Sequence, residues 1–449
     1  MGLLIGIGNT MPKFPYDYYY GVEFDINVAS PACTRIGRPE FHVSLPIQSR
    51  MRRCILNNAG TVVYYLHAQD STKRDNATAA DLTGASGQVM VELPEYYIRF
   101  EMEGTKRRCL MSLEELPGFY KIPKMYVSAY EATIDRTIPS TLKLASVVNT
   151  TADFRGCNNQ SDRDETYRSA LGRPATSFSI NIRKYARNRG SINWSCMTYD
   201  AHKSLFWLFA VEYATFNCQT AYNAALTPEG HRQGGLGDGV TTLNSTKWAA
   251  FNDSYPFIPC GHTNSLGNAT GLVPFKMPAE YDATILTVQV PSYRGIENPF
   301  GHIAKLVDGC FVNVDIDGKV DFYVCSRPDL FDDEQAYKML FTRIVTGGFL
   351  KDIHFNSKGD IFPTETSGSS STYYCDYFEK TIPSNAKTKY AVRYGFAAHM
   401  GTFAGLAGIS TSLLYSAADA KTGTRLCYLK NPDYYYNGSM KMIGTIGLF

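Results

Sequence analysis

The sequence predicts an α+β protein in which a β-rich N-terminal domain precedes a larger domain with two main helices and long glycine-rich loops. Short aliphatic runs separated by turn residues fill the first 125 residues, and helical patterns are confined to two segments after residue 175. The 449 residues include 37 Gly and 31 Tyr, and at about 150 residues per domain the length allows two or three domains. We expect a β-rich attachment and oligomerisation domain over 1–125, an irregular connector over 126–175, the larger domain over 176–429 and an extension over 430–449.

Strands are expected in the N-terminal domain at 61–66, 87–93 and 96–101, where aliphatic, β-branched and aromatic residues recur. Turn clusters, such as the Asn and Gly residues of 57–60, separate these runs. The stretch 68–86 is rich in Asp, Thr, Ala and Gly and predicts a long loop. One further strand is expected near 126–132.

Two helices are expected in the larger domain. The segment 181–189 (NIRKYARNR) has a basic last turn and is followed by Gly190, which is typical of a short helix and its end. Asp200 is predicted to cap a second helix over 201–217, whose apolar residues lie nearly all round and therefore predict burial. Beyond residue 220 we expect short strands and loops, including a hairpin that turns at Asp317-Gly318.

Composition excludes several classes of partner. Lys and Arg number 44 and Asp and Glu 42, a formal charge of +2, so the basic excess of a nucleic-acid-binding protein is missing. No apolar run approaches 18 residues, so membrane insertion is not expected. The 11 cysteines contain no C-x-x-C pair and predict buried free thiols in a protein assembled in a reducing cytoplasm.

The sequence contains no catalytic pattern. The eight histidines form no H-E-x-x-H, and no G-x-S-x-G is present. The glycine-rich stretch 234–239 lacks the pattern of a phosphate-binding loop. We therefore predict no enzymatic activity, no cofactor and no metal site.

Three segments resemble the C-type-lectin-like fold. The stretch 293–303 (YRGIENPFGHI), followed by Asp308-Gly309, is similar to a pattern of the formylglycine-generating, sulfatase-modifying branch of that fold. The stretch 194–200 (WSCMTYD) resembles the W-x-x-M-T-Y entry into a helix of the same branch, and 423–429 (GTRLCYL) resembles its terminal strand. The resemblance implies a C-type-lectin-like domain over 176–429.

Two departures from that branch bear on activity and packing. Ala304-Lys305-Leu306 stands where the branch has Trp-x-Trp, so the core there must repack. The formylglycine-generating enzymes carry a pair of copper-binding cysteines near the C-terminus, whereas here only Cys427 follows Cys375. The resemblance therefore implies the fold without the oxidase chemistry.

The whole chain resembles large proteins of phages that infect gut Bacteroidetes, including variable proteins of diversity-generating retroelements. The resemblance runs from about Tyr20 through 123–130 (PKMYVSAY) to Leu429. In such proteins a C-type-lectin-like domain displays a ligand-contacting surface near the C-terminus, which implies the segment 395–415 here. The extension over 430–449 is expected to dock on a neighbour or on another virion protein.

The residues of 395–415 support two alternatives. Small residues with scattered large ones, and Gly at 395, 401, 405 and 408, predict an irregular segment that folds tightly and displays side chains, or a loop that crosses the core. In the first alternative the ligand-binding residues are Phe396, His399, Met400, Thr402, Leu406, Ser410, Leu413 and Tyr415.

The resulting hypothesis is that the chain is a phage virion protein. It would be a tail-fibre or receptor-binding subunit that attaches to a bacterial cell-surface glycan or protein without catalysis. A homotrimer in contact with other virion proteins is expected. The alternatives are a structural virion component, such as a head fibre, collar or tail decoration, and an enzyme or bacterial adhesin built on the same fold.

Overall fold

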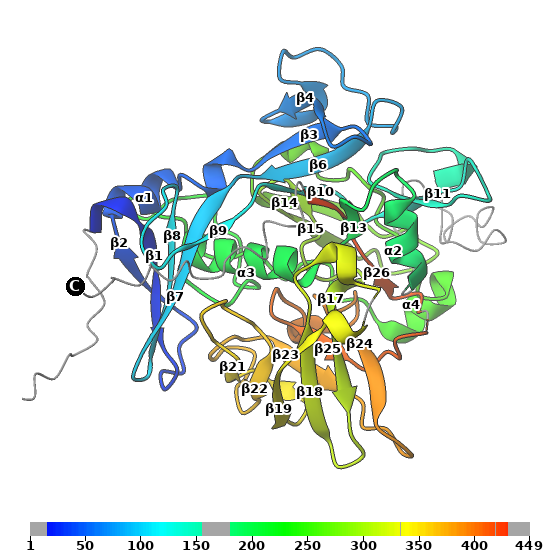
Figure 1. Cartoon of the computed structure of the whole chain (residues 1–449). Coiled ribbons are helices and arrows are strands. Elements are labelled where there is room, and N and C mark those ends of the chain that lie inside the picture. The colour runs from blue at the N-terminus through cyan, green and yellow to red at the C-terminus, as the bar shows by residue number, and fades with distance from the viewer. Residues whose placement is uncertain (1–15, 155–179, 333, 418, 430–449) are drawn as a thin grey trace, which may run out of the picture.

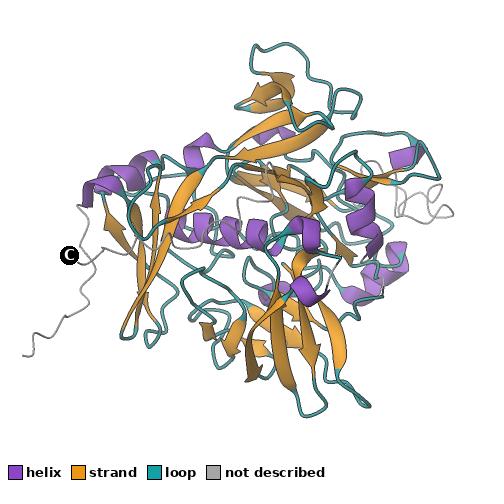
Figure 2. Ribbon diagram, viewed as in Figure 1, coloured by secondary structure: helices purple, strands orange, loops and turns teal. Residues whose placement is uncertain are grey.

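The computed structural model describes residues 16–154, 180–332, 334–417 and 419–429, and most of its regular structure is β (Figures 1 and 2). The strands form several mainly antiparallel sheets, and helices are few. This agrees with the predicted α+β class, with β structure dominant. The predicted extension over 430–449 and part of the predicted connector lie outside the described residues.

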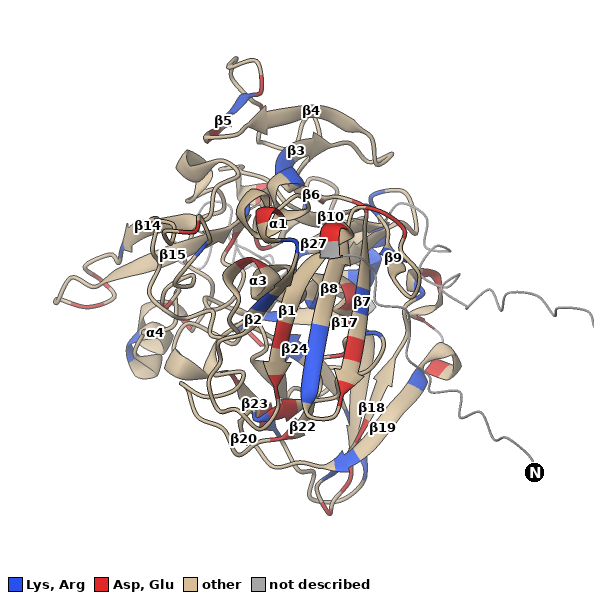
Figure 3. Cartoon of the chain, turned by 90° about the vertical axis from the view of Figure 1, so that its left-hand side faces the viewer, with Lys and Arg blue, Asp and Glu red and all other residues tan. Residues whose placement is uncertain are grey.

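A five-stranded antiparallel sheet lies at one side of the molecule. Its strands in spatial order are β2 (Thr34–Gly37), β1 (Tyr20–Asp25), β8 (Lys106–Ser112), β7 (Tyr96–Glu103) and β9 (Tyr120–Ile122). On its charged face, basic β8 residues lie between acidic residues of β1 and β7 (Figure 3). Arg108 is 2.6 Å from Glu23 and 3.4 Å from Glu101, so cross-strand ion pairs neutralise this face.

A seven-stranded sheet joins distant parts of the chain. Its strands in spatial order are β13 (Trp194–Cys196), β27 (Leu426–Leu429), β10 (Met125–Ser128), β6 (Gln88–Leu93), β3 (Arg52–Leu56), β4 (Val62–His67) and β5 (Asp70–Arg74). The expected boundary at residue 125 falls at β10, which pairs with β6 on one side and with β27 on the other. Sheet and core therefore continue across that position.

The third large sheet lies at the bottom of the view in Figure 1. Its strands in spatial order are β19 (Lys338–Ile344), β18 (Lys319–Val324), β17 (Ala304–Val314), β24 (Thr388–Tyr394), β25 (Ile409–Thr411), β23 (Tyr377–Lys380) and β20 (Gly348–Phe349), and β26 (Thr422–Gly423) pairs with β17. The β17–β18 hairpin turns at Asp317-Gly318 as predicted, with Gly318 at φ 82°.

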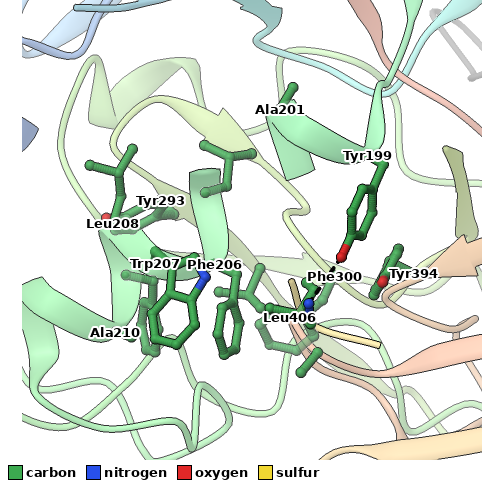
Figure 4. Close-up of a cluster of buried hydrophobic side chains, with 14 of the residues drawn as sticks. Tyr199, Ala201, Phe206, Trp207, Leu208, Ala210, Tyr293, Phe300, Tyr394 and Leu406 are labelled. Carbon is green, nitrogen blue, oxygen red and sulfur yellow. Dashed lines mark hydrogen bonds between the residues drawn. The ribbon is translucent and has the colours of Figure 1, made fainter. Parts of the chain in front are cut away.

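Helix α3 (Tyr199–Tyr213) runs through the centre of the molecule and is buried on nearly all sides, as predicted. Figure 4 shows its side chains among those of other elements in the main core. The polar side chains on this helix are paired: Lys203 Nζ lies 2.9 Å from Asp360 Oδ1, and Arg294 donates to Glu212. Such pairing offsets the cost of burying their charges.

The helix predictions were partly wrong in their limits. The cap of α3 is Thr198, whose hydroxyl accepts from Ala201 N, and not Asp200. The helix ends at Tyr213 rather than near residue 217 because Ala214 adopts a left-handed conformation at φ 52°. The other predicted helix is α2 (Ile180–Arg187).

Two helices and several strands, among them β5, were not predicted individually. Helix α4 (Ser245–Asn252) is as long as α2, so the expectation of only two main helices was incomplete. Its cap is Asn244, whose side chain accepts from the Lys247 N–H, a pattern that the sequence contained. Helix α1 (Pro39–Ser44) begins with proline, and β5 lies inside the expected loop over 68–86.

Smaller sheets complete the fold: β11 (Thr133–Asp135) with β12 (Lys143–Ala145), β14 (Gly271–Lys276) with β15 (Thr287–Tyr293) and β16 (Ile296–Glu297), and β21 (Asp352–Ile353) with β22 (Pro363–Glu365). Long loops connect them.

Candidate ligand-binding site

One face of the third sheet brings together polar and aromatic side chains from three strands. Side chains two residues apart on a strand point the same way, so Tyr377 and Glu379 share the face of β23 opposite the buried Phe378. The register pairs Glu379 with Ser410 on β25 and Ser410 with Arg393 on β24. We call this surface the β23–β25 face.

Its polar half is a hydrogen-bonded cluster around a carboxylate and a guanidinium. Glu379 Oε2 accepts from Ser410 Oγ at 2.6 Å and from Ser412 Oγ at 2.9 Å. Arg393 Nη2 donates to the same two hydroxyls at 2.8 and 2.9 Å, and its Nη1 donates to Thr422 Oγ1 at 2.8 Å. Glu379, Arg393, Ser410 and Ser412 are therefore each hydrogen-bonded to at least two others of the cluster.

Part of this hydrogen-bonding capacity is unused. Among the described residues, the buried Nε of Arg393 and Nδ1 of His399 have no hydrogen-bond partner. The Glu379 side chain is 38% exposed and that of Asp419, 3.4 Å from Arg393, is 32% exposed. Burial, together with the charge of Lys421, lowers the pKa of His399, so its ring is neutral near pH 7. The two partly exposed carboxylates thus remain accessible to a bound molecule.

The other half of the face is aromatic. Phe403, in the short helix η8 (Gly401–Phe403), stacks on Tyr377 with ring centroids 3.9 Å apart and planes at 10°. Phe349 on β20 meets both rings edge-on, at 5.2 Å from Tyr377 and 5.5 Å from Phe403. All three are half-buried, so the stack reaches solvent beside the polar cluster.

The structure separates the eight predicted ligand-binding residues by burial. Thr402 is exposed, and His399, Met400, Leu413 and Tyr415 are half-buried. Phe396, Leu406 and Ser410 are buried.

Two of the eight predicted residues border the β23–β25 face: Ser410 belongs to its polar cluster, and Thr402 directly precedes Phe403. The His399 ring lies instead 5.8 Å from that of Trp248, which belongs to another core cluster. Phe396 and Leu406 lie instead in the main core, as the alternative of a core-crossing loop requires.

Leu413 and Tyr415 lie apart from this face. Tyr415 Oη accepts from Arg183 Nη2 at 3.2 Å, and that guanidinium also lies 2.5 Å from Asp308. Leu413 packs with Tyr415 against a second core cluster. The structure therefore does not bring all eight residues to one surface.

The eight residues predicted from the sequence omit most of the face. Phe349, Tyr377, Glu379 and Arg393 lie on strands before residue 395, and Phe403 and Ser412 lie within the segment 395–415 but were not among the eight. The alternation of Tyr377, buried Phe378 and Glu379 is a signal of a half-buried strand that the sequence contained.

The ten cysteine thiols in the described ranges are free and shielded from solvent. Nine of the ten cysteines in the described ranges are buried and Cys33 is half-buried, in agreement with the prediction of buried free thiols. Burial raises the pKa of each above its ordinary value, which suppresses the reactive thiolate.

The described parts of the chain lack two other kinds of feature. They contain no group of three or more His, Cys, Asp or Glu side chains placed to bind a metal ion. Within the same ranges, no helix combines the length and apolar character needed to cross a membrane.

Comparison with known proteins adds no assignment. No protein-family model matches the chain, and no curated protein matches it.

Proposed function

We propose that the chain is a bacteriophage virion protein, a tail-fibre or receptor-binding subunit that recognises a bacterial surface ligand without turnover through a C-type-lectin-like domain. The observation that carries this proposal is the β23–β25 face, where a half-buried aromatic stack adjoins a hydrogen-bonded polar cluster with two partly exposed carboxylates. This face replaces the full set of eight residues predicted from the sequence.

The arrangement of the three segments that resemble the lectin-like fold supports the proposed domain. Strand β13, in the first segment, pairs with β27, in the last. The Asp308 N–H donates to Met197 O at 2.8 Å, and the Arg425 guanidinium donates to Asn298 O at 2.7 Å. Segments more than 100 residues apart in sequence therefore contact one another, as parts of one domain would.

The chemistry of the face favours a glycan over a protein surface. A sugar ring has an apolar C–H face, which packs on an aromatic ring, and hydroxyls that both donate and accept. Tyr377 and Phe403 offer the aromatic surface, and Glu379, Arg393 and Asp419 offer charged hydrogen-bonding partners. Charged groups roughly double the strength of such hydrogen bonds.

Binding of the recombinant full chain to cells of gut Bacteroidetes tests this proposal. Tyr377→Ala and Glu379→Gln are each expected to weaken binding about tenfold or more, the effect of losing a central contact. Matched controls are Tyr18→Ala, an exposed tyrosine on the other side of the protein, and Glu334→Gln, an exposed glutamate. Competition by released surface polysaccharide is expected, and undiminished binding of a Y377A/E379Q double variant would overturn the assignment.

A structural virion component is the second candidate, and one observation favours it. Strand β19 is the outer strand of its sheet, and its Met339 and Ile344 side chains are 54% and 64% exposed. An apolar edge strand is a surface suited to pairing with another chain. Labelling of particles with antibody, together with absence of cell binding, would favour this function, and light scattering would test the expected homotrimer.

A further inference from the structure

The aromatic half of the β23–β25 face depends on the short loop that joins η8 to β25. This loop, residues 404–408, follows directly on Phe403 and leads into Ser410. The position of Phe403 over Tyr377 is therefore set by whatever holds this loop.

A buried carboxylate holds it. Asp376 precedes Tyr377 in the chain, is only 1% exposed, and its Oδ2 accepts from the Ala407 N–H at 2.7 Å. Burial raises the pKa of Asp376 well above its ordinary value, while hydrogen bonds from the backbone of Ala407 and Gly408 act in the opposite direction. The carboxyl group thus lies in the core with backbone groups of the loop as partners.

Gly405 completes the fit between the loop and the carboxylate. A Cβ atom at this position would lie 1.9 Å from Asp376 Oδ1, much closer than any real contact. The carboxylate occupies the space where a side chain would be, so only glycine permits this approach.

Helix α3 and the segment after it hold the same loop from a different direction. The Leu406 carbonyl lies 2.8 Å from His202 Nε2, and the Leu406 N–H donates to Cys218 Sγ at 3.4 Å. The loop is thereby anchored to the buried core.

We propose that Asp376 is a positioning residue for ligand binding, because its carboxylate fixes residues 405–408 and so holds Phe403 on Tyr377. The inference rests on the proposed function of the β23–β25 face. Tyr377 and Phe403 touch the ligand, whereas Asp376 acts only through the loop.

Hydrogen–deuterium exchange on the full chain tests the structural step without any ligand. In Asp376→Asn, which keeps the shape of the side chain, amides of 401–408 are expected to exchange at least tenfold faster, while those of β17 are unchanged. Gly405→Ala perturbs the same contact from the loop side and is expected to reproduce this local change. Asp315→Asn, in the exposed β17–β18 turn, is the matched control. Unchanged exchange at 401–408 in both D376N and G405A overturns the proposal.

Cell binding by the same variants tests the functional step. D376N and G405A are expected to lose at least fivefold in affinity, with little further loss when either is combined with Phe403→Ala. If Tyr377→Ala abolishes binding while D376N and G405A bind normally, the positioning role is overturned and the proposed face stands. If exchange at 401–408 rises as expected but neither Y377A nor D376N affects binding, the proposed face itself is wrong.

Discussion

Glu131→Gln is expected to lower the free energy of unfolding by about 3–5 kcal/mol, the cost of breaking a buried ion pair from one side. Glu131, His302 and Lys305 are almost completely buried. Glu131 Oε2 lies 2.5 Å from His302 Nδ1, and Oε1 lies 2.6 Å from Lys305 Nζ. Oε2 therefore accepts a hydrogen bond from His302, and Oε1 is ion-paired with Lys305, whose Nζ also donates to Gly301 O.

The donors of His302 and Lys305 explain why a neutral amide cannot replace the Glu131 carboxylate. His302 Nε2 accepts from the N–H groups of Phe257 and Ile258 at 3.1 and 3.2 Å, so the ring proton is on Nδ1 and must be accepted by Glu131. The Lys305 ammonium offers only donors. A glutamine side chain in place of Glu131 would turn its NH2 group toward one of these donors and leave that donor unpaired.

The pKa shifts of Glu131 and Lys305 also support a loss of stability in Glu131→Gln. Burial alone would raise the pKa of Glu131, but the charge of Lys305 and the hydrogen bond from His302 lower it to about 2. Burial lowers the pKa of Lys305 to about 8, and the attraction of Glu131 opposes that shift. Without the carboxylate, Lys305 loses the charge that stabilises its ammonium form.

Urea unfolding at pH 7 measures the effect. The matched control is Glu334→Gln, which removes a 71% exposed carboxylate paired with Lys389 and is expected to cost less than about 1 kcal/mol. A loss below about 1 kcal/mol in E131Q, with an unchanged denaturant dependence, would refute the reasoning.

Two further predictions concern acid stability and a helix cap. Burial lowers the pKa of His42 and of His202 to about 4. The unfolded chain therefore binds these protons at a higher pH than the folded chain does, and the stability present above pH 6.5 is lost as the pH falls from 6.5 to about 4. The expected loss is about 3 kcal/mol per histidine, and urea midpoints from pH 7 to pH 4 measure it; a slope that His202→Gln leaves unaltered would contradict this origin. Thr198→Ala removes the cap of α3 and is expected to cost about 1 kcal/mol by the same assay, whereas an unchanged midpoint would show that the cap hydrogen bond contributes nothing.

Local sequence patterns were sufficient to predict features that depend on neighbouring residues. The strands expected at 87–93 and 96–101 correspond to β6 and β7, and the Asp317-Gly318 turn joins β17 and β18. The burial of α3 followed from apolar residues around its whole circumference. Periodicity and turn chemistry act within a few residues, so they can be read without knowing the tertiary fold.

Features set by distant residues could not be predicted in this way. Glu379, Arg393 and Ser410 are 14 to 31 residues apart and become neighbours only through the register of β23, β25 and β24. Within 395–415, the sequence could not show that Phe396 and Leu406 face the core while Thr402 faces solvent. Which side of an irregular segment is buried depends on the sheet that it covers.

Contacts between distant residues also connect the buried group of Glu131, His302 and Lys305 to the β23–β25 face. Arg294, Asn298 and His302 all have left-handed backbone conformations, each of which costs about 1–3 kcal/mol and persists only where surrounding contacts enforce it. Arg425 and the Glu131 group supply such contacts to this loop.

The strained loop in turn holds the start of the 395–415 segment. The Gly301 N–H donates to Gly395 O at 2.7 Å, and the Ala398 N–H donates to His302 O at 3.0 Å. The segment is therefore anchored at its start by the loop that Glu131 stabilises, and near β25 by Asp376. The exposed residues between these two anchors are therefore positioned by buried contacts, which is how the proposed ligand-binding face could be ordered although its segment has little regular structure.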